Sequence, residues 1–282
     1  MSDTFRLGGD GPEVRRLGFG AMRLTGRGIW GEPPDREAAR DVVRRAVELG
    51  ANLIDTADAY GPEVSEEIIA EALHPYPDDL VIATKGGLVR PGPGRWERDG
   101  RPEHLREACE DSLRRLRLDA IELYQLHAVD SKVPLEDSLG ALLELQAQGK
   151  IRRIGLSNVD VGQLGQALEL TEVATVQNRY NLVDRGSEDV LEECERQGIG
   201  FIPWFPLATG DLARSGGSLD EAARRHDATP GQVALAWLLA RSDVMLPIPG
   251  TGSIEHLEEN MGAARLRLGP DEVAALGEAT VG

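Results

Sequence analysis

Cysteines are rare in this chain, and long apolar runs are missing from it. The two cysteines, Cys109 and Cys194, show neither the spacing of zinc ligands nor a disulfide framework, so we expect no metal site and two reduced, packed thiols. No apolar run approaches the ~20 residues of a membrane-spanning helix. The first ten residues also lack the charged-then-apolar order of a signal peptide. We therefore expect a cytoplasmic protein with no membrane partner.

Positive charge is also in short supply. Against 48 Asp and Glu the chain has 31 Lys and Arg, which gives a formal net charge of -17. Nucleic acids and anionic membranes attract basic surfaces, so we expect neither as a partner.

No linker divides the chain, because the Gly/Pro-rich stretches 86–102 and 209–217 are short and read as loops. We predict one domain over residues 1–282, acting on a small molecule as a monomer or weak homo-oligomer.

Short apolar runs alternate with amphipathic segments along the chain. The runs predict eight strands, at Leu17–Gly20, Asn52–Asp55, Leu80–Lys85, Ala120–His127, Ile151–Ser157, Thr175–Asn178, Gly200–Trp204 and Val244–Pro247. A doubly wound sheet would show a glycine-rich dinucleotide fingerprint after its first strand, and none occurs. The pattern therefore predicts an α/β fold of the (β/α)8 barrel type. An N-terminal β-hairpin of Phe5–Leu7 and Val14–Leu17 is expected to plug the barrel's bottom.

Helix signals fill the intervals between these strands and follow the last one. Asp35 is a good N-cap, and Thr229 with Gln232 forms a capping box. The predicted helices are Asp35–Leu49, Val64–Leu73, Pro102–Leu116, Leu135–Gln148, Val161–Leu170, Glu188–Gln197, Pro230–Arg241, Ile254–Ala263 and Pro270–Ala279.

Four reactive side chains stand at or just after the ends of successive predicted strands. Asp55 ends one apolar run, Tyr60 follows it, and Lys85 and His127 end the next two. Strand ends lie side by side at one face of a barrel, so these groups can converge. A phenol with an ordinary pKa of about 10 needs help to act as an acid at neutral pH. We expect Lys85 to lower that pKa, Asp55 to pair with the lysine, and a neutral His127 to orient a carbonyl oxygen.

Such a site can protonate an oxygen but cannot supply electrons. A hydride must come from a nicotinamide or a flavin. At later strand ends, Ser157, Asn158 and Gln177 offer partners for a carboxamide, and Trp204 offers a flat face for a ring. The Gly/Thr/Ser loop 250–253 runs into a helix start, where backbone N–H groups and the helix dipole favour a phosphate.

From about Leu17 to the last helix, the chain resembles the aldo-keto reductase family. The shared motifs are Leu53–Gly61, Ala83–Lys85, Leu126–His127, Gly155–Asn158, Gln177–Asn181, Trp204–Leu207 and Pro247–Thr251. The resemblance implies a catalytic tetrad of Asp55, Tyr60, Lys85 and His127. It also implies NADP(H) across the barrel top, contacted by Ser157, Asn158, Gln177, Trp204, Phe205, Leu207, Glu259 and Asn260, with the last two near the adenine.

Two positions depart from the family pattern. Many members hold the ribose 2'-phosphate with a lysine and an arginine, where this chain has Gly250 and His256. We expect NADPH as the cofactor, with Thr251, Ser253 and His256 as phosphate contacts, and NADH stays open. The loops after the first strand resemble those of bacterial members that reduce pyridoxal. Pyridoxal is therefore a candidate substrate beside other small aldehydes and ketones.

The substrate pocket is expected to take its walls from two loops. The chain after Ala263 is too short to close over the barrel mouth, so the predicted pocket residues are Met22, Leu24, Trp30 and Trp96. Truncating Trp30 should then weaken the turnover of small aromatic aldehydes. Two other readings stay open, a Schiff-base lyase that uses Lys85 as its amine and a subunit that senses NADPH with little turnover.

Overall fold

Seven parallel strands form the central sheet of this protein. The computed structural model describes residues 3–208 and 218–279, so the predicted loop at 209–217 lies outside the described residues. The sheet order is β11-β10-β9-β8-β5-β4-β3. Its strands are β3 (Phe19–Gly20), β4 (Leu53–Asp55), β5 (Val81–Gly86), β8 (Ile121–Leu126), β9 (Ile151–Ser157), β10 (Thr175–Arg179) and β11 (Gly200–Trp204).

Residues 244–250 join the two edges of this sheet and close the barrel. On one side Leu246 N donates to Phe201 O at 2.7 Å, and on the other Gly18 N donates to Pro247 O at 3.0 Å. The prediction of a regular eighth strand at Val244–Pro247 was wrong, because only the bridge between Phe201 and Met245 forms there. Pro247 and Pro249 have no N–H to donate, so a continuous ladder cannot form. The barrel itself is confirmed.

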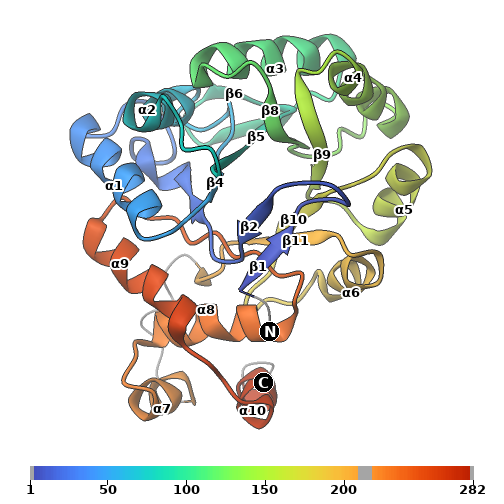
Figure 1. Cartoon of the computed structure of the whole chain (residues 1–282). Coiled ribbons are helices and arrows are strands. Elements are labelled where there is room, and N and C mark those ends of the chain that lie inside the picture. Colours follow the sequence, from blue (N-terminus) through green and yellow to red (C-terminus); the bar gives the residue numbers. More distant parts are fainter. Residues whose placement is uncertain (1–2, 209–217, 280–282) are drawn as a thin grey trace.

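Helices surround the barrel, as Figure 1 shows. They are α1 (Arg36–Glu48), α2 (Val64–Leu73), α3 (Pro102–Leu116), α4 (Leu135–Ala147), α5 (Val161–Leu170), α6 (Glu188–Gln197), α7 (Ser218–Arg225), α8 (Pro230–Arg241), α9 (Ile254–Gly262) and α10 (Pro270–Ala279), with 3-10 turns η1 (Ala21–Leu24) and η4 (Ala263–Arg265). The predicted caps are confirmed, since Asp35 accepts from Ala38 N and Thr229 forms its capping box. Helix α7 was not predicted. In the described ranges, no helix combines the length and apolar composition needed to cross a membrane.

The predicted N-terminal hairpin is confirmed and lies across one end of the barrel (Figure 1). Its strands are β1 (Thr4–Arg6) and β2 (Glu13–Arg15), paired antiparallel. Leu7 and Val14 are fully buried in the apolar cluster of the barrel interior, together with strand residues such as Leu53 and Leu123. The bottom of the barrel is thus filled with side chains, which leaves the opposite end for a site.

A second hairpin, which was not predicted, occupies the stretch 86–102. Strands β6 (Leu88–Gly92) and β7 (Arg95–Arg98) pair antiparallel. The prediction of a plain loop was wrong because the prolines and glycines of residues 91–94, which end β6 and form its turn, dominated the pattern. Apolar residues on both sides of a Gly-containing turn are a hairpin signal.

Candidate active site

Asp55, Lys85 and Tyr60 form a hydrogen-bonded chain at the carboxyl ends of β4 and β5. Lys85 Nζ lies 2.7 Å from Asp55 Oδ2 and 3.3 Å from Tyr60 Oη, and it also donates to Thr56 O at 2.7 Å. The parallel register puts Asp55 opposite Ala83, so Lys85 lies two residues further along β5, and its long side chain reaches the carboxylate of Asp55. Lys85 is completely buried, and Asp55 is 2% exposed. The ammonium therefore has three fixed oxygen partners and no access to bulk water.

Two glutamine amides hold the other oxygen of Asp55. Gln177 Nε2 donates to Oδ1 at 2.7 Å and Gln125 Nε2 donates to it at 3.1 Å. The carboxylate thus joins strands β4, β5, β8 and β10 in one buried network. Sequence reasoning missed Gln125, although a polar residue that alternates with apolar ones just before His127 was a signal for an inward-facing side chain.

Burial dominates the electrostatics of Tyr60. It raises the pKa of the phenol above its ordinary value, Lys85 opposes that rise, and Asp55 adds to it. The expectation that Lys85 would lower this pKa is therefore wrong in its net direction, because it left out desolvation. For Lys85, burial favours the neutral amine, but Asp55 and Tyr60 together raise its pKa. At neutral pH the phenol keeps its proton beside a charged ammonium.

His127 completes the group as a neutral imidazole. Burial and then the charge of Lys85 hold its pKa well below the ordinary value. Its ring lies edge-on to that of Tyr60, with centroids 5.8 Å apart. Among the described residues, the buried Nδ1 has no hydrogen-bond partner. A neutral imidazole carries one N–H, so this side chain can donate to an oxygen held near Tyr60.

Asn158 ties together the ends of three strands beside His127. It has a left-handed φ of 58°. Its amide donates to His127 O and to Ser157 Oγ, both at 3.0 Å, and its Oδ1 accepts from Trp204 Nε1 at 3.1 Å. The structure therefore brings Ser157, Asn158 and Trp204 together as expected. Both N–H groups of the Asn158 amide are already used within the protein.

One cavity of about 990 Å³ brings most of the predicted site residues together. It is lined by Met22, Asp55, Tyr60, Trp96, His127, Ser157, Asn158, Gln177, Trp204, Phe205, Leu207, Gly250, Thr251, His256, Glu259 and Asn260. Sequence reasoning did not assign Arg23, Ile248 or Pro249, which also line it.

Four predicted residues do not line this cavity. Lys85 lies beneath Asp55 and Tyr60. Ser253 serves as the N-cap of α9 and accepts from His256 N. Leu24 is 1% exposed and packs in the core between the barrel and the helices α1 and α2. Trp30 packs over the guanidinium of Arg90 instead of facing the cavity. Leu24 and Trp30 are thus corrected as pocket residues.

The far end of the cavity is suited to an anion. Gly250, Thr251 and Gly252 line it just before the N-terminus of α9, and the positive end of a helix dipole favours an anion. A Cβ on Gly250 would lie 2.6 Å from Gly20 O, so only glycine allows this close approach. Nearby, Glu259 is held by Thr229, whose Oγ1 donates to its carboxylate at 2.6 Å.

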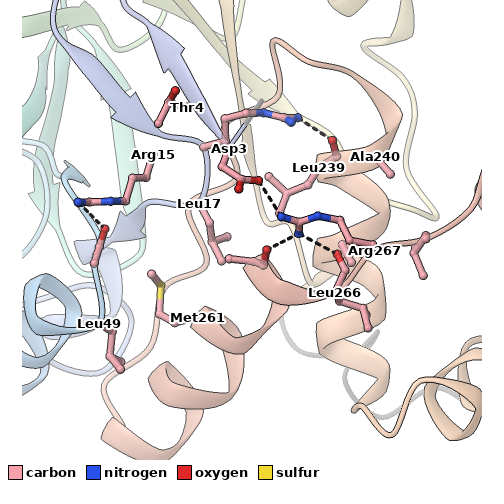
Figure 2. A pocket seen from close by; sticks show the side chains of 15 residues that line it. Asp3, Thr4, Arg15, Leu17, Leu49, Leu239, Ala240, Met261, Leu266 and Arg267 are labelled. Atoms are coloured by element: carbon pink, nitrogen blue, oxygen red, sulfur yellow. Dashed lines mark hydrogen bonds and ion pairs between the residues drawn. The ribbon is translucent and has the colours of Figure 1, made fainter. Parts of the chain in front are cut away.

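A smaller cavity of about 340 Å³ lies between the N-terminal residues, α8 and the segment after α9 (Figure 2). Its arginines are already engaged. Arg267 pairs with Asp3 at 2.8 Å, Arg15 donates to Gly50 O at 2.9 Å, and the buried Arg16 donates to Leu239 O at 2.6 Å. It holds no tyrosine, histidine or lysine. The described residues also contain no group of three or more His, Cys, Asp or Glu arranged to hold a metal. The larger cavity is therefore the candidate site.

Comparisons with known proteins agree with this geometry. The profile of the Aldo/keto reductase family matches residues 16–280. An uncharacterised oxidoreductase of Schizosaccharomyces pombe is 51% identical over 265 residues, which cover 94% of this chain and 86% of that protein. The pyridoxine 4-dehydrogenase of Escherichia coli is 43% identical over 281 residues, covering 98% and 97%.

Solved structures give the same picture. The glycerol dehydrogenase of Gluconobacter oxydans superimposes with a TM-score of 0.90 at 28% identity, covering 98% of this chain and 94% of that one. An aldo-keto reductase of Klebsiella pneumoniae in complex with NADPH has a TM-score of 0.83 at 29% identity, covering 100% and 96%.

Proposed function

The chain belongs to the aldo/keto reductase family, and we propose that it reduces a small aldehyde or ketone to the alcohol with NADPH. The observation that carries this proposal is the position of Lys85 Nζ, which is hydrogen-bonded to both Asp55 and Tyr60, two residues that line the cavity. A protonated phenol next to a fixed ammonium is an acid ready to protonate an oxygen. The membership makes the protein an NAD(P)H-dependent oxidoreductase.

The cavity fits a nicotinamide dinucleotide. It reaches from the catalytic group to the N-terminus of α9, where Gly250, Thr251 and Gly252 line it, and a helix N-terminus favours a phosphate. The residues proposed to hold the cofactor are Ser157, Asn158 and Gln177 at the carboxamide, Trp204 at the ring, Gly250, Thr251 and His256 at the phosphates, and Glu259 and Asn260 at the adenine. When bound, the cofactor supplies the hydride that the side chains cannot.

Each catalytic side chain has a distinct proposed task. Tyr60 gives its proton to the carbonyl oxygen, and the charged Lys85 stabilises the phenolate that remains. Asp55 keeps the ammonium in place. Neutral His127 donates a hydrogen bond that orients the carbonyl oxygen. Since burial keeps Tyr60 protonated, the acid is in its reactive form at neutral pH.

The apolar side of the cavity limits the substrate to a small or flat carbonyl compound. Met22, Ile29, Leu88 and Trp96 line it. Pyridoxal fits this description, and the similarity to a pyridoxine 4-dehydrogenase supports it as one substrate. The two cysteines are buried and unpaired, which suits a reducing compartment such as the cytoplasm.

A screen of NADPH consumption with small aldehydes, pyridoxal among them, tests the proposal. The same screen with NADH measures the cofactor preference, and Tyr60→Phe serves as the inactive control. Tight NADPH binding without turnover of any carbonyl compound would contradict the proposal and favour a sensing role. A Schiff-base lyase would instead be trapped by borohydride. However, Lys85 Nζ is buried, charged and hydrogen-bonded to three oxygens, which argues against its use as an amine nucleophile.

A further inference from the structure

Arg90 of β6 lies behind the apolar wall of the cavity, between two indole rings. Its guanidinium carbon is 3.7 Å from the centroid of the Trp96 ring and 5.4 Å from that of the Trp30 ring. Arg90 is 8% exposed. In the described part of the chain it forms no ion pair with Asp or Glu. A buried cation without a carboxylate is costly, so its other contacts must explain why it is there.

Backbone carbonyl groups from three segments supply those contacts. Arg90 Nη1 donates to Ile29 O at 2.8 Å and to Ala59 O at 3.1 Å. Nε donates to Arg95 O at 3.0 Å. The segments are the loop after β3, the turn just before Tyr60 and the hairpin β6–β7. A guanidinium is planar with five N–H groups, so one side chain can fix all three segments at once.

Each of these segments contributes to the carbonyl end of the cavity. Ile29 and Trp96 line it, and Ala59 directly precedes Tyr60. The Trp96 ring centroid is 6.5 Å from those of both Tyr60 and His127. Arg90 therefore bonds to the residue that precedes the proposed acid, and it contacts Trp96 of the proposed wall.

The loop held by Arg90 is strained. Ile29 has a φ of 59°, which a β-branched residue adopts only when its surroundings impose it. The carbonyl of this same residue accepts from Arg90. The neighbouring Trp30 pairs with Gly61 on the other side of Tyr60. The strained loop is thus attached to both flanks of the proposed acid, and strain of this kind gathers at functional sites.

We propose that Arg90 is a positioning residue that fixes Trp96 and the Ile29 loop against Tyr60 and so sets the shape of the carbonyl subsite. The proposal rests on the reductase function above. With Arg90 in this role, the wall of the carbonyl subsite is already formed before the substrate binds. A preformed wall favours flat rings over bulky or flexible carbonyl compounds. The contacts of Arg90 all lie at the carbonyl end, so the phosphate end at α9 is independent of it.

Replacing Arg90 with Met tests the proposal, with Arg98→Met on the exposed strand β7 as the matched control. Misplacement by about 1 Å can cost about 100-fold in rate. We expect kcat/KM for pyridoxal or benzaldehyde to fall about 10- to 100-fold in Arg90→Met, chiefly through KM. The Kd for NADPH should not change. Arg90→Lys should recover part of the loss, since it keeps a cation over Trp96 but not the planar donor set.

A double-mutant cycle with Trp96→Ala separates positioning from general destabilisation. Once Trp96 is gone, Arg90→Met should cost much less in kcat/KM than it does in the wild type. In the protein without cofactor, Arg90→Met should also increase acrylamide quenching of tryptophan fluorescence, and most of that increase should vanish in a Trp96→Phe background. Additive losses, an unchanged KM or an equal loss of NADPH affinity would overturn the proposal. A wild type that reduces no carbonyl compound would refute the proposed function instead. The quenching measurement would still test whether Arg90 fixes the Trp96 ring.

Discussion

Replacing Lys85 with Met removes the one cation from a sealed network and leaves Asp55 buried without a charge partner. Asp55 Oδ2 then loses its 2.7 Å bond, while Oδ1 keeps the amides of Gln125 and Gln177. Breaking a buried ion pair by removing one partner typically costs ~3–5 kcal/mol. Each kcal/mol lowers Tm by about 2 °C in a chain of this size. We therefore expect Lys85→Met to lower Tm by about 6–10 °C and to abolish carbonyl reduction.

A double variant shows whether the orphaned charge causes this loss. In Asp55→Asn with Lys85→Met the carboxylate is gone, and neutral groups of similar volume fill the same space. Replacing a whole buried ion pair is often neutral or stabilising, so Tm should return most of the way to that of the wild type while activity stays absent.

The assays are thermal unfolding followed by circular dichroism and NADPH consumption with a small aldehyde. A Lys85→Met protein with the Tm of the wild type would show that other groups stabilise the buried Asp55 carboxylate. A double variant less stable than Lys85→Met would refute the reasoning as well, because the Asp55 carboxylate would then stabilise the fold even without Lys85.

Three further predictions follow from the same geometry. Tyr60→Phe should bind NADPH normally and lose ~10²–10⁴-fold in carbonyl reduction, and near-normal turnover would remove Tyr60 as the acid. His127 is neutral in the fold with its pKa well below the ordinary 6.5, so stability should fall as pH drops below about 6.5, and Tm against pH should be flatter in His127→Gln. Trp96→Ala should reduce kcat/KM for aromatic aldehydes more than Trp30→Ala does, because of these two tryptophans only Trp96 lines the cavity; equal effects in steady-state kinetics would contradict this.

The barrel could be predicted because its pattern repeats, whereas its exceptions depend on single residues. Alternating apolar runs and capped helices predicted seven barrel strands in the correct order and the helices between them, but they missed α7. The eighth strand failed because Pro247 and Pro249 accept but cannot donate backbone bonds. The hairpin β6–β7 was missed because the prolines and glycines at 91–94, at the end of β6 and in its turn, are typical of a loop.

The candidate site likewise has residues that the sequence pattern predicts and others that it does not. Asp55, Tyr60, Lys85 and His127 end or follow parallel strands, whose carboxyl ends lie at the same end of the barrel, so their place in the sequence was enough to predict that they gather there. Side-chain direction in a loop has no such rule. The positive φ of Ile29 belongs to a turn that puts Trp30 over Arg90, and nothing in the sequence marks it. The net pKa direction of Tyr60 was likewise out of reach, because it depends on burial as well as on Lys85.

Strands and loops therefore control different properties of this protein. The buried network of Asp55 and Lys85 spans four strands, so changes in it should affect kcat and stability together. The carbonyl wall comes from two loops, and Arg90 holds them through backbone carbonyls instead of through the catalytic side chains. Changes at Arg90 should therefore alter substrate choice and KM while the acid remains intact. Barrels acquire new substrates by altering their loops above fixed strand ends. One arginine that holds both loops is an efficient position for such a change, since a single substitution there reshapes the whole wall.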